Sequence, residues 1–237
     1  MADYLNWSEK ILNDPSTEAV EKAYDEGFVF TRIGKGVMQQ TRSLRINIDR
    51  FVLTSENRRI LKKVEDIKTG TMTPKALSIP YKDYNFKMGK LAKDFYEAKF
   101  GSGIMSAQKI KEMLTNAEKS NFNLLLTYLT KPRKCDGKDL SDSSALGFAI
   151  CYSNANILHY SYPFYDLTKA PKDMGLAMMI MAVQYAKENG LKYIYLGSLQ
   201  RSSDTYKLQF KGLEWFNGKA WQTDLEEAKK ILKSVNE

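Results

Sequence analysis

The stretch "DLTKAPKDMGLAMMIMAVQYAKENGLKYIYLGS", residues 166–198, decides the fold. It begins where an alternating strand pattern over 156–166 ends, and it opens with a short polar loop. An apolar helical run follows over about 173–189 and stops at Asn189-Gly190, and a second strand pattern covers 192–197. The order strand, loop, helix, strand predicts a helix that packs on a sheet and connects two of its strands.

Working outward from this stretch, the same patterns predict the other elements. Strands are expected at 28–33, 42–48, 123–130 and 145–153, and helices at 13–27 (capped by Asp14), 55–67, 88–99, 106–119 (capped by Ser106) and from the Thr223-Asp224-Leu225-Glu226 capping box onward. Residues 69–86 are rich in turn formers and predict a loop. The fold class expected is α/β (α+β), a mixed central sheet flanked by helices. Its domains would be an N-terminal helical and strand subdomain at 1–70 and a core at 71–237.

Composition narrows the classes of function. The formal net charge is +8 and the pI about 9.2, a balance that favours acidic partners, nucleic acid first among them. Two cysteines and one histidine are too few for a Cys/His zinc site, so no metal is expected. Cys151 lies in an apolar run and reads as buried packing, whereas His159 fits either a structural or a catalytic role.

Location follows from the same composition. The sequence offers neither a signal-peptide pattern nor an apolar run long enough to span a membrane. With only two cysteines, it predicts a protein of the reducing cytoplasm that has no membrane partner.

A cluster of basic residues occupies the helix predicted at 55–67. At 100° per residue, one face carries the cations and the other the apolar residues Ile60, Leu61, Val64 and Ile67. The cations are Arg58, Arg59, Lys62 and Lys63. The apolar face is expected to dock and the basic face to meet water, either as a solvated surface or as one that binds phosphates.

The loop before the apolar helix is a candidate phosphate site. Lys172-Asp173-Met174-Gly175-Leu176-Ala177 places small residues, Gly175 and Ala177, where backbone N–H groups of a helix start could receive phosphate oxygens. The run resembles the Gln/Arg-x-x-Gly-x-Gly/Ala signature of the GNAT acyltransferase fold, with Lys172 in the first position. The alternative is an ordinary helix start.

Three blocks resemble the arginyl-tRNA–protein transferase family, which has a GNAT-like catalytic core. They are "TRSLRINIDRFVLTSENRRILKK" (41–63), "YSYPFYDLTKAPKDMGLAMMIMAVQYAKENGLKYIYLG" (160–197) and "DTYKLQFKGLEWFNGKAW" (204–221), in the family's order. The chain departs from the family where a Cys-x-x-Cys-Arg element often stands, since it reads Met38-Gln39-Gln40-Thr41-Arg42. It resembles a divergent member without the N-terminal cysteine cluster. Asp166-Leu167 replaces the family's Asp-Pro, and Ser198-Leu199 an aromatic pair.

The resemblance implies transfer of an amino acid, arginine by expectation, from a charged tRNA to the amine of a protein or peptide, usually an N-terminal α-amine. An ester of this kind is already activated, so positioning and proton transfer suffice and no cofactor is expected. The implied catalytic residues are Asp166, Tyr165 and Tyr206. The implied donor-binding residues are Lys172, Gly175, Leu176, Ala177, Ser198 and Lys207, and the implied tRNA-binding residues are Arg42, Arg58, Arg59, Lys62 and Lys63.

Two alternatives remain open on the sequence. The first is an acyl-CoA-dependent N-acyltransferase of the GNAT class that uses acetyl-CoA and binds its pyrophosphate at the same loop. The second is a non-catalytic, tRNA-binding relative. For Asp166 itself, capping of a turn is the structural alternative to a catalytic role.

Overall fold

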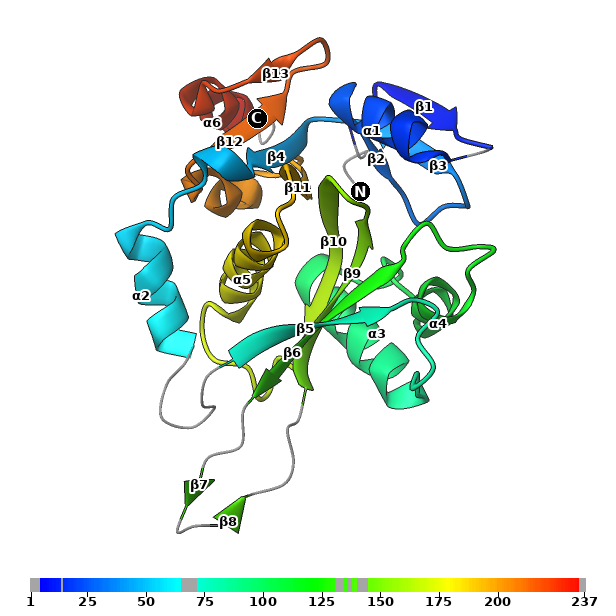
Figure 1. The fold of residues 1–237 in the computed structure, drawn as a ribbon, viewed down its shortest axis with the longest axis vertical. Helices are drawn as coiled ribbons and strands as arrows, with labels where there is room; N and C mark the ends of the chain where they lie inside the picture. The colour runs from blue at the N-terminus through cyan, green and yellow to red at the C-terminus, as the bar shows by residue number, and fades with distance from the viewer. Residues whose placement is uncertain are drawn as a thin grey trace. The chain divides into compact units, whose positions relative to one another are not determined.

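The structure, a computed structural model, describes residues 5–13, 15–64, 72–130, 134–135, 138–139 and 145–234 (Figure 1). The chain forms two compact units, each built from separated segments: unit 1 contains 1–54, 152–161 and 186–237, and unit 2 contains 55–151 and 162–185. The boundary predicted between residues 70 and 71 lies outside the described residues and stays a prediction.

Unit 1 combines a small sheet with part of the main sheet. The small sheet has the order β1-β3-β2, formed by β1 (Ser8–Ile11), β2 (Phe28–Phe30) and β3 (Val37–Gln40). The other elements are α1 (Thr17–Asp25), β4 (Ser43–Asn47), η1 (Ile48–Arg50), the start of β10 (Ile157–Tyr165), β11 (Tyr193–Ser198), η2 (Ser202–Gln209), β12 (Leu213–Phe216), β13 (Trp221–Gln222) and α6 (Leu225–Ser234). Strands β10 and β11 run parallel, whereas β4 is antiparallel to both β11 and β12.

Unit 2 packs helices on antiparallel strands. It contains α2 (Ser55–Val64), β5 (Met72–Ser78), α3 (Phe86–Phe100), α4 (Ala107–Thr115), β6 (Leu124–Thr130), β7 (Lys134–Cys135), β8 (Lys138–Asp139), most of β9 (Ala145–Ser153) and most of α5 (Met174–Glu188). Strand β6 pairs antiparallel with β5 and with β9, and helices α3 and α4 lie side by side (Figure 1).

The main sheet has the strand order β13-β12-β4-β11-β10-β9-β6-β5. Because it contains both parallel and antiparallel pairs and carries helices, the predicted mixed α/β class is confirmed. Helix α5 has an apolar face at the core: Met174, Met178, Met179 and Met181 are all buried, as core packing requires. The hydroxyl of Tyr128 on β6 donates to the carbonyl of Met178 at 2.9 Å, which fixes α5 on the strands of unit 2.

The predicted loop at 69–86 is wrong, because its described part contains strand β5. Every β5 residue from Met72 to Ser78 has a partner on β6. The strand ends the sheet order, and an edge position tolerates the missing N–H of Pro74. The pattern was weak because Pro74 and Lys75 interrupt the alternation.

Two predicted helix caps also differ from the structure. Helix α1 is capped by Ser16, whose Oγ accepts from the N–H of Ala19, and the predicted cap Asp14 lies outside the described residues. Helix α6 is capped by Asp224, which accepts from the N–H groups of Glu226 and Glu227, instead of by Thr223. The cap of α4 by Ser106 is confirmed.

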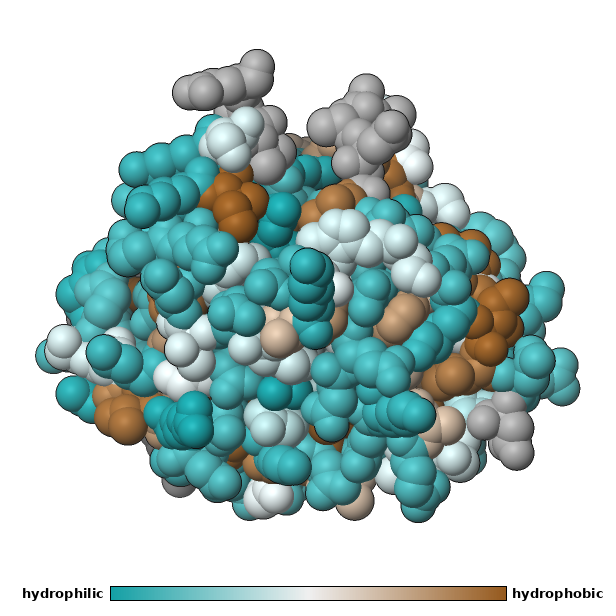
Figure 2. All heavy atoms as spheres, turned by 90° about the horizontal axis from the view of Figure 1, so that it is seen from above, coloured by the Kyte–Doolittle hydropathy of each residue, from teal (hydrophilic) through white to brown (hydrophobic). Residues whose placement is uncertain are grey.

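The surface is largely hydrophilic, with separate hydrophobic patches on the face drawn in Figure 2. Within the described part of the chain, no helix has the length and apolar character needed to cross a bilayer.

Candidate functional site

Helix α2 presents the predicted basic face. Ile60 and Val64 are buried, whereas Arg58, Arg59, Lys62 and Lys63 are exposed, so the predicted separation of faces is confirmed. Ile67 lies outside the described residues. Arg59 forms a bidentate pair with Glu56, whose hydrogen bond is the main cause of a raised Arg59 pKa. The helix is therefore held by its apolar side and exposes its cations to solvent.

Helix α5 begins beside this basic face. Lys63 Nζ donates to Asp173 Oδ2 at 3.2 Å, and the charge of Asp173 also contributes to the raised pKa of Arg59. Asp173 has a φ of 70°, a left-handed conformation that aspartate tolerates better than most residues, and its carbonyl accepts from the N–H of Ala177. The basic helix and the phosphate-loop candidate thus meet within unit 2.

The first turn of α5 has the geometry expected of an anion site. The amides of Gly175 and Leu176, both half-buried, lie where a helix supplies no acceptor of its own, at the positive end of the helix dipole. Ala177 is buried, and Lys172 is exposed at the loop. These residues could hold the phosphates of a nucleotide or of an RNA 3′ end.

Gly175 has a packing role as well. A Cβ added at this position would lie 3.4 Å from the ring and from the hydroxyl oxygen of Tyr165, the last residue of β10. The Tyr165 ring also packs against Phe95, with centroids 4.7 Å apart. The missing side chain at 175 leaves space beside the Tyr165 hydroxyl at the helix start.

Asp166 forms the turn that follows β10. Its Oδ1 accepts from the backbone N–H of Thr168 at 2.9 Å and from the Thr168 hydroxyl at 2.6 Å, and Lys169 lies 3.6 Å from its Oδ2. The Thr168 hydroxyl is the main cause that lowers the pKa of Asp166. The turn-capping alternative is therefore present in the structure, and the carboxylate is charged at neutral pH.

A second group of predicted residues lies in unit 1. Lys207 Nζ donates to the carbonyl of Ser198 at 2.9 Å and pairs with Asp204 at 3.1 Å. Arg42 donates to the carbonyl of Leu199, and burial lowers its pKa. The loop after β11 thus gathers Arg42, Ser198 and Lys207.

Tyr206 lies near the same loop, on η2. Its side chain is partly exposed. Desolvation of its hydroxyl, and secondarily the negative charge of Asp204, raises the pKa of Tyr206 to about 12. The hydroxyl is therefore protonated at neutral pH and can donate a hydrogen bond.

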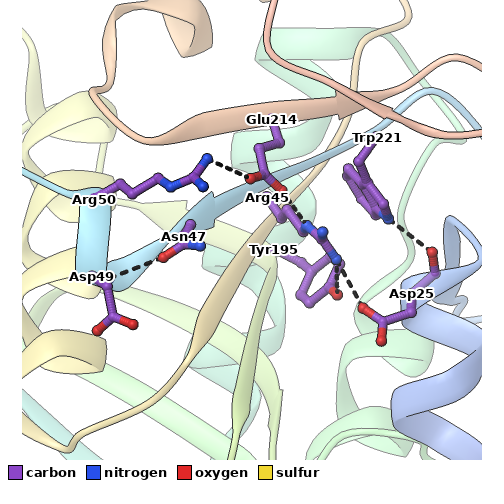
Figure 3. Close-up of polar contacts among 8 residues, drawn as sticks. All are labelled: Asp25, Arg45, Asn47, Asp49, Arg50, Tyr195, Glu214 and Trp221. Carbon is purple, nitrogen blue, oxygen red and sulfur yellow. Dashed lines mark hydrogen bonds and ion pairs between the residues drawn. The ribbon is translucent and has the colours of Figure 1, made fainter.

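The structure contains a cluster of polar contacts around the buried Arg45 that the sequence did not predict (Figure 3). Arg45 Nε donates to Glu214 at 2.7 Å and its Nη1 to Asp25 at 2.8 Å, while the guanidinium lies about 4 Å from the ring centroids of Tyr193 (4.1 Å) and Trp221 (4.0 Å). The residues come from all three family-like blocks except Asp25. Losing one partner of a buried ion pair typically costs about 3–5 kcal/mol, so the cluster fixes β4, β11 and β12 together.

Two further expectations are settled by burial. His159 is buried against Tyr24, with the hydroxyl and Nδ1 2.9 Å apart, and burial lowers its pKa to about 3. This buried environment fits the structural role of His159, the alternative to a catalytic one. Cys151 is fully buried, as predicted. Over the described residues, no group of three His, Cys, Asp or Glu side chains could hold a metal ion.

Sequence reasoning missed Arg45, Asp173 and Gln200 as members of these sites. The alternation of Arg45 with apolar residues predicts only that it lies on the opposite face of the strand from Leu44 and Ile46, whereas β12 and α1 supply carboxylates to it. Asp173 precedes the helix, a position that could have marked it as the contact for Lys63. The side-chain contacts of Gln200 join residues far apart in the sequence, so no local pattern signals them.

Comparison with known proteins finds relatives named aspartate/glutamate leucyltransferase. No family model matches it. It is 25% identical over 184 residues to the aspartate/glutamate leucyltransferase of Cereibacter sphaeroides, covering 76% of this chain and 61% of that protein. It is 27% identical over 187 residues to the protein of the same name from Methylorubrum extorquens, covering 76% and 70%.

A solved structure, L-PGS from Bacillus licheniformis, superposes with a TM-score of 0.46 at 14% identity, covering 92% of this chain and 69% of that one. The aligned region spans about three fifths, 61%, of the length of the Cereibacter sphaeroides leucyltransferase. It is similar to proteins named leucyltransferases, and these relatives do not support arginine as the amino acid that is transferred.

Proposed function

We propose that this chain transfers an amino acid from a charged tRNA to the amine of a protein or peptide. The observation that carries the proposal is the contact of Lys63 with Asp173, which sets the exposed cations of α2 beside the first turn of α5. A cationic helix face supplies phosphate contacts along an acceptor stem, and a helix start supplies N–H groups for an internucleotide phosphate near the 3′ end. Acyl-CoA chemistry needs only the second of these features.

Leucine is the amino acid that this proposal favours, and peptides beginning with Asp or Glu are the favoured acceptors. Both follow from the name of the relatives, aspartate/glutamate leucyltransferase, over 76% of this chain. Arginine, the amino acid implied by the sequence resemblance, is the competing donor in the same assay.

The proposed chemistry is aminolysis of an ester. The amine nitrogen of the acceptor bonds to the carbonyl carbon of the aminoacyl ester, the bond to the 3′ oxygen of the tRNA breaks, and a proton passes from the amine to that oxygen. An α-amine has a pKa of about 8, so a neutral fraction is present near pH 7.5 without a strong base. The lowered pKa of Asp166 suits it to attract the ammonium form and to shape the turn. In this proposal the Tyr165 hydroxyl, which lies 3.4 Å from a Cβ built at Gly175, donates to the ester carbonyl or to the 3′ oxygen.

The test is a panel of charged tRNAs, leucyl and arginyl included, with peptides that begin with Asp, Glu or other residues. Mass spectrometry should detect the added amino acid, and RNase should abolish the reaction. Absence of both transfer and tRNA binding at low salt contradicts the proposal. Binding without transfer supports the non-catalytic relative instead.

The variant Gly175→Ala separates function from folding. The added methyl reaches an ordinary contact distance of 3.4 Å from Tyr165, and alanine favours a helix over glycine by about 1 kcal/mol. We expect a stability equal to or above that of the wild type. The methyl occupies the space at the helix start, and a loss of about 1.4 kcal/mol of transition-state stabilisation corresponds to tenfold in kcat/KM. A variant with unchanged kcat/KM would remove Gly175 from the site.

A further inference from the structure

Side chains bind the main chain of Leu5. Gln200 Oε1 accepts from the Leu5 N–H at 2.9 Å, and Gln200 Nε2 lies 3.4 Å from the Leu5 carbonyl oxygen. The hydroxyl of Thr41 donates to the same carbonyl at 2.7 Å. Both main-chain hydrogen-bonding groups of one residue are therefore contacted, the pattern with which a carboxamide recognises an extended main chain.

The contact differs from ordinary strand pairing. Strand β1 pairs with β3 through backbone groups, and this ladder continues to Trp7, whose N–H donates to the carbonyl of Gln40 at 2.9 Å. Two residues earlier, Thr41 and Gln200 replace the partner strand with their side chains. Such contacts read main-chain atoms, so they accept many sequences in place of Leu5.

The donor and acceptor roles of Thr41, Gln200 and Ser198 are compatible with one another. Because the Thr41 hydroxyl donates to Leu5, its oxygen can accept from Gln200 Nε2, which lies 2.7 Å away. Gln200 Nε2 also lies 3.0 Å from the Ser198 hydroxyl oxygen. Thr41 and Ser198 are buried, so this side of the site is closed to solvent. The carboxamide can take only the orientation that receives an N–H and offers an N–H.

The loop that carries Gln200 is fixed independently of Leu5. The carboxylate of Asp204 accepts from the backbone N–H groups of Gln200 at 2.9 Å and of Arg201 at 3.0 Å. Lys207 joins the same loop by its bond to Ser198 and its ion pair with Asp204. A site whose parts are held in place needs little reorganisation when its occupant changes.

We propose that Gln200 and Thr41, supported by Ser198, form a binding site for an extended peptide main chain that the chain's own Leu5 occupies in cis. The role of the trans occupant rests on the proposed function: it is the leading segment of the acceptor polypeptide, whose main chain the site recognises whatever its side chains. The cis segment then competes with the acceptor, and its release raises the apparent affinity for peptide.

The experiment measures binding of a labelled, acetylated peptide with the sequence of residues 4–9 to the full chain, without tRNA, by fluorescence anisotropy. Leu5→Pro removes the N–H that Gln200 receives, while Leu5→Ala, the matched control, keeps both main-chain groups. One lost hydrogen bond of about 1–1.5 kcal/mol predicts roughly tenfold tighter peptide binding by Leu5→Pro. Leu5→Ala should match the wild type. Adding Gln200→Ala or Thr41→Val to Leu5→Pro should remove the gain.

A peptide methylated at the nitrogen of its leucine provides a test that does not depend on any variant. It should bind the wild type several-fold more weakly than the unmodified peptide, since it lacks the N–H. The proposal is overturned if both peptides bind alike, or if Leu5→Pro is folded and binds peptide no more tightly. Because the assay contains no tRNA, it measures peptide binding separately from transfer. If the peptide binds as expected while the panel of charged tRNAs gives no transfer, only the transfer proposal is overturned.

Discussion

At the scale of single residues, His159 makes stability depend on pH. It is the one histidine of the chain, and burial lowers its pKa from 6.5 to about 3. The unfolded chain binds a proton as the pH falls below 6.5, whereas the folded chain does not. Stability is therefore complete above that pH and is lost as the pH falls toward the folded pKa, with a slope of up to ~1.4 kcal/mol per pH unit.

Replacing His159 with glutamine tests this linkage, because an amide can still bond the Tyr24 hydroxyl but does not titrate. Between about pH 7 and pH 4.5 the wild type should lose about 2 kcal/mol more than His159→Gln, as measured by urea unfolding. Most carboxylates titrate below this window. Parallel stability profiles for the two proteins would show that His159 does not carry the effect.

The sequence pattern predicts which side chains are buried. It is a poorer guide to the residues that those side chains contact. The burial of Cys151 and of the α5 methionines follows from their apolar surroundings. The two carboxylates around Arg45 come from α1 and β12, about 20 residues before it (Asp25) and 169 after it (Glu214). No local period encodes such a contact, so the alternation of β4 predicted only that Arg45 faces away from Leu44 and Ile46.

At the scale of elements, the basic face of α2 is the surface expected to contact the phosphates of a nucleic acid. Lys62 is exposed on it, and Lys87 is an exposed lysine on α3 of the same unit. Lys62→Glu should weaken tRNA binding about 5- to 10-fold at low salt and reduce the dependence of binding on salt, since one phosphate contact is lost. Lys87→Glu makes the same charge change and should have little effect.

Anisotropy titrations at about 50 and 200 mM salt provide the measurement. Equal losses in both variants would mean that net charge, and not the face of α2, attracts the RNA. Neither substitution should lower the melting temperature by much, because both side chains are in solvent.

Elements with strong periods were predictable and edge elements were not. Helices α2, α4 and α5 and strands β6, β9 and β10 follow hydrophobic patterns that packing on one face imposes. Strand β5 does not, because an edge strand keeps one side in solvent and tolerates Pro74 and Lys75. The short strands β12 and β13 lie in a segment without a clear period, and they are organised by the pairing of β12 with β4 and of β13 with β12.

At the scale of the whole molecule, three separated blocks of sequence supply parts of the same sites. Arg45, Tyr193 and Glu214 belong to different blocks and meet in one cluster, and Lys63 and Asp173 join two blocks in another. Each of these contacts therefore depends on more than one block. Between the first two blocks, α4, β6 and β9 agree with their predicted ranges, whereas the edge strand β5 could be placed only by the structure.

The net charge is +8, and the basic face of α2 and the first turn of α5 are both candidate anion sites. We therefore expect the stability of the fold to depend on anionic ligands. A ligand that binds only the folded state stabilises it by about 2.7 kcal/mol at one hundred times its dissociation constant, which shifts a melting temperature by several degrees. tRNA should produce such a shift at low salt and lose it as salt rises, because phosphate contacts dominate its binding. Acetyl-CoA should produce no comparable shift, since it has no acceptor stem to contact the cations of α2 on which the proposed binding rests. Thermal scans with each ligand decide between the two: stabilisation by acetyl-CoA in the absence of any tRNA effect would favour acyl-CoA-dependent transfer and contradict the role assigned to the basic face.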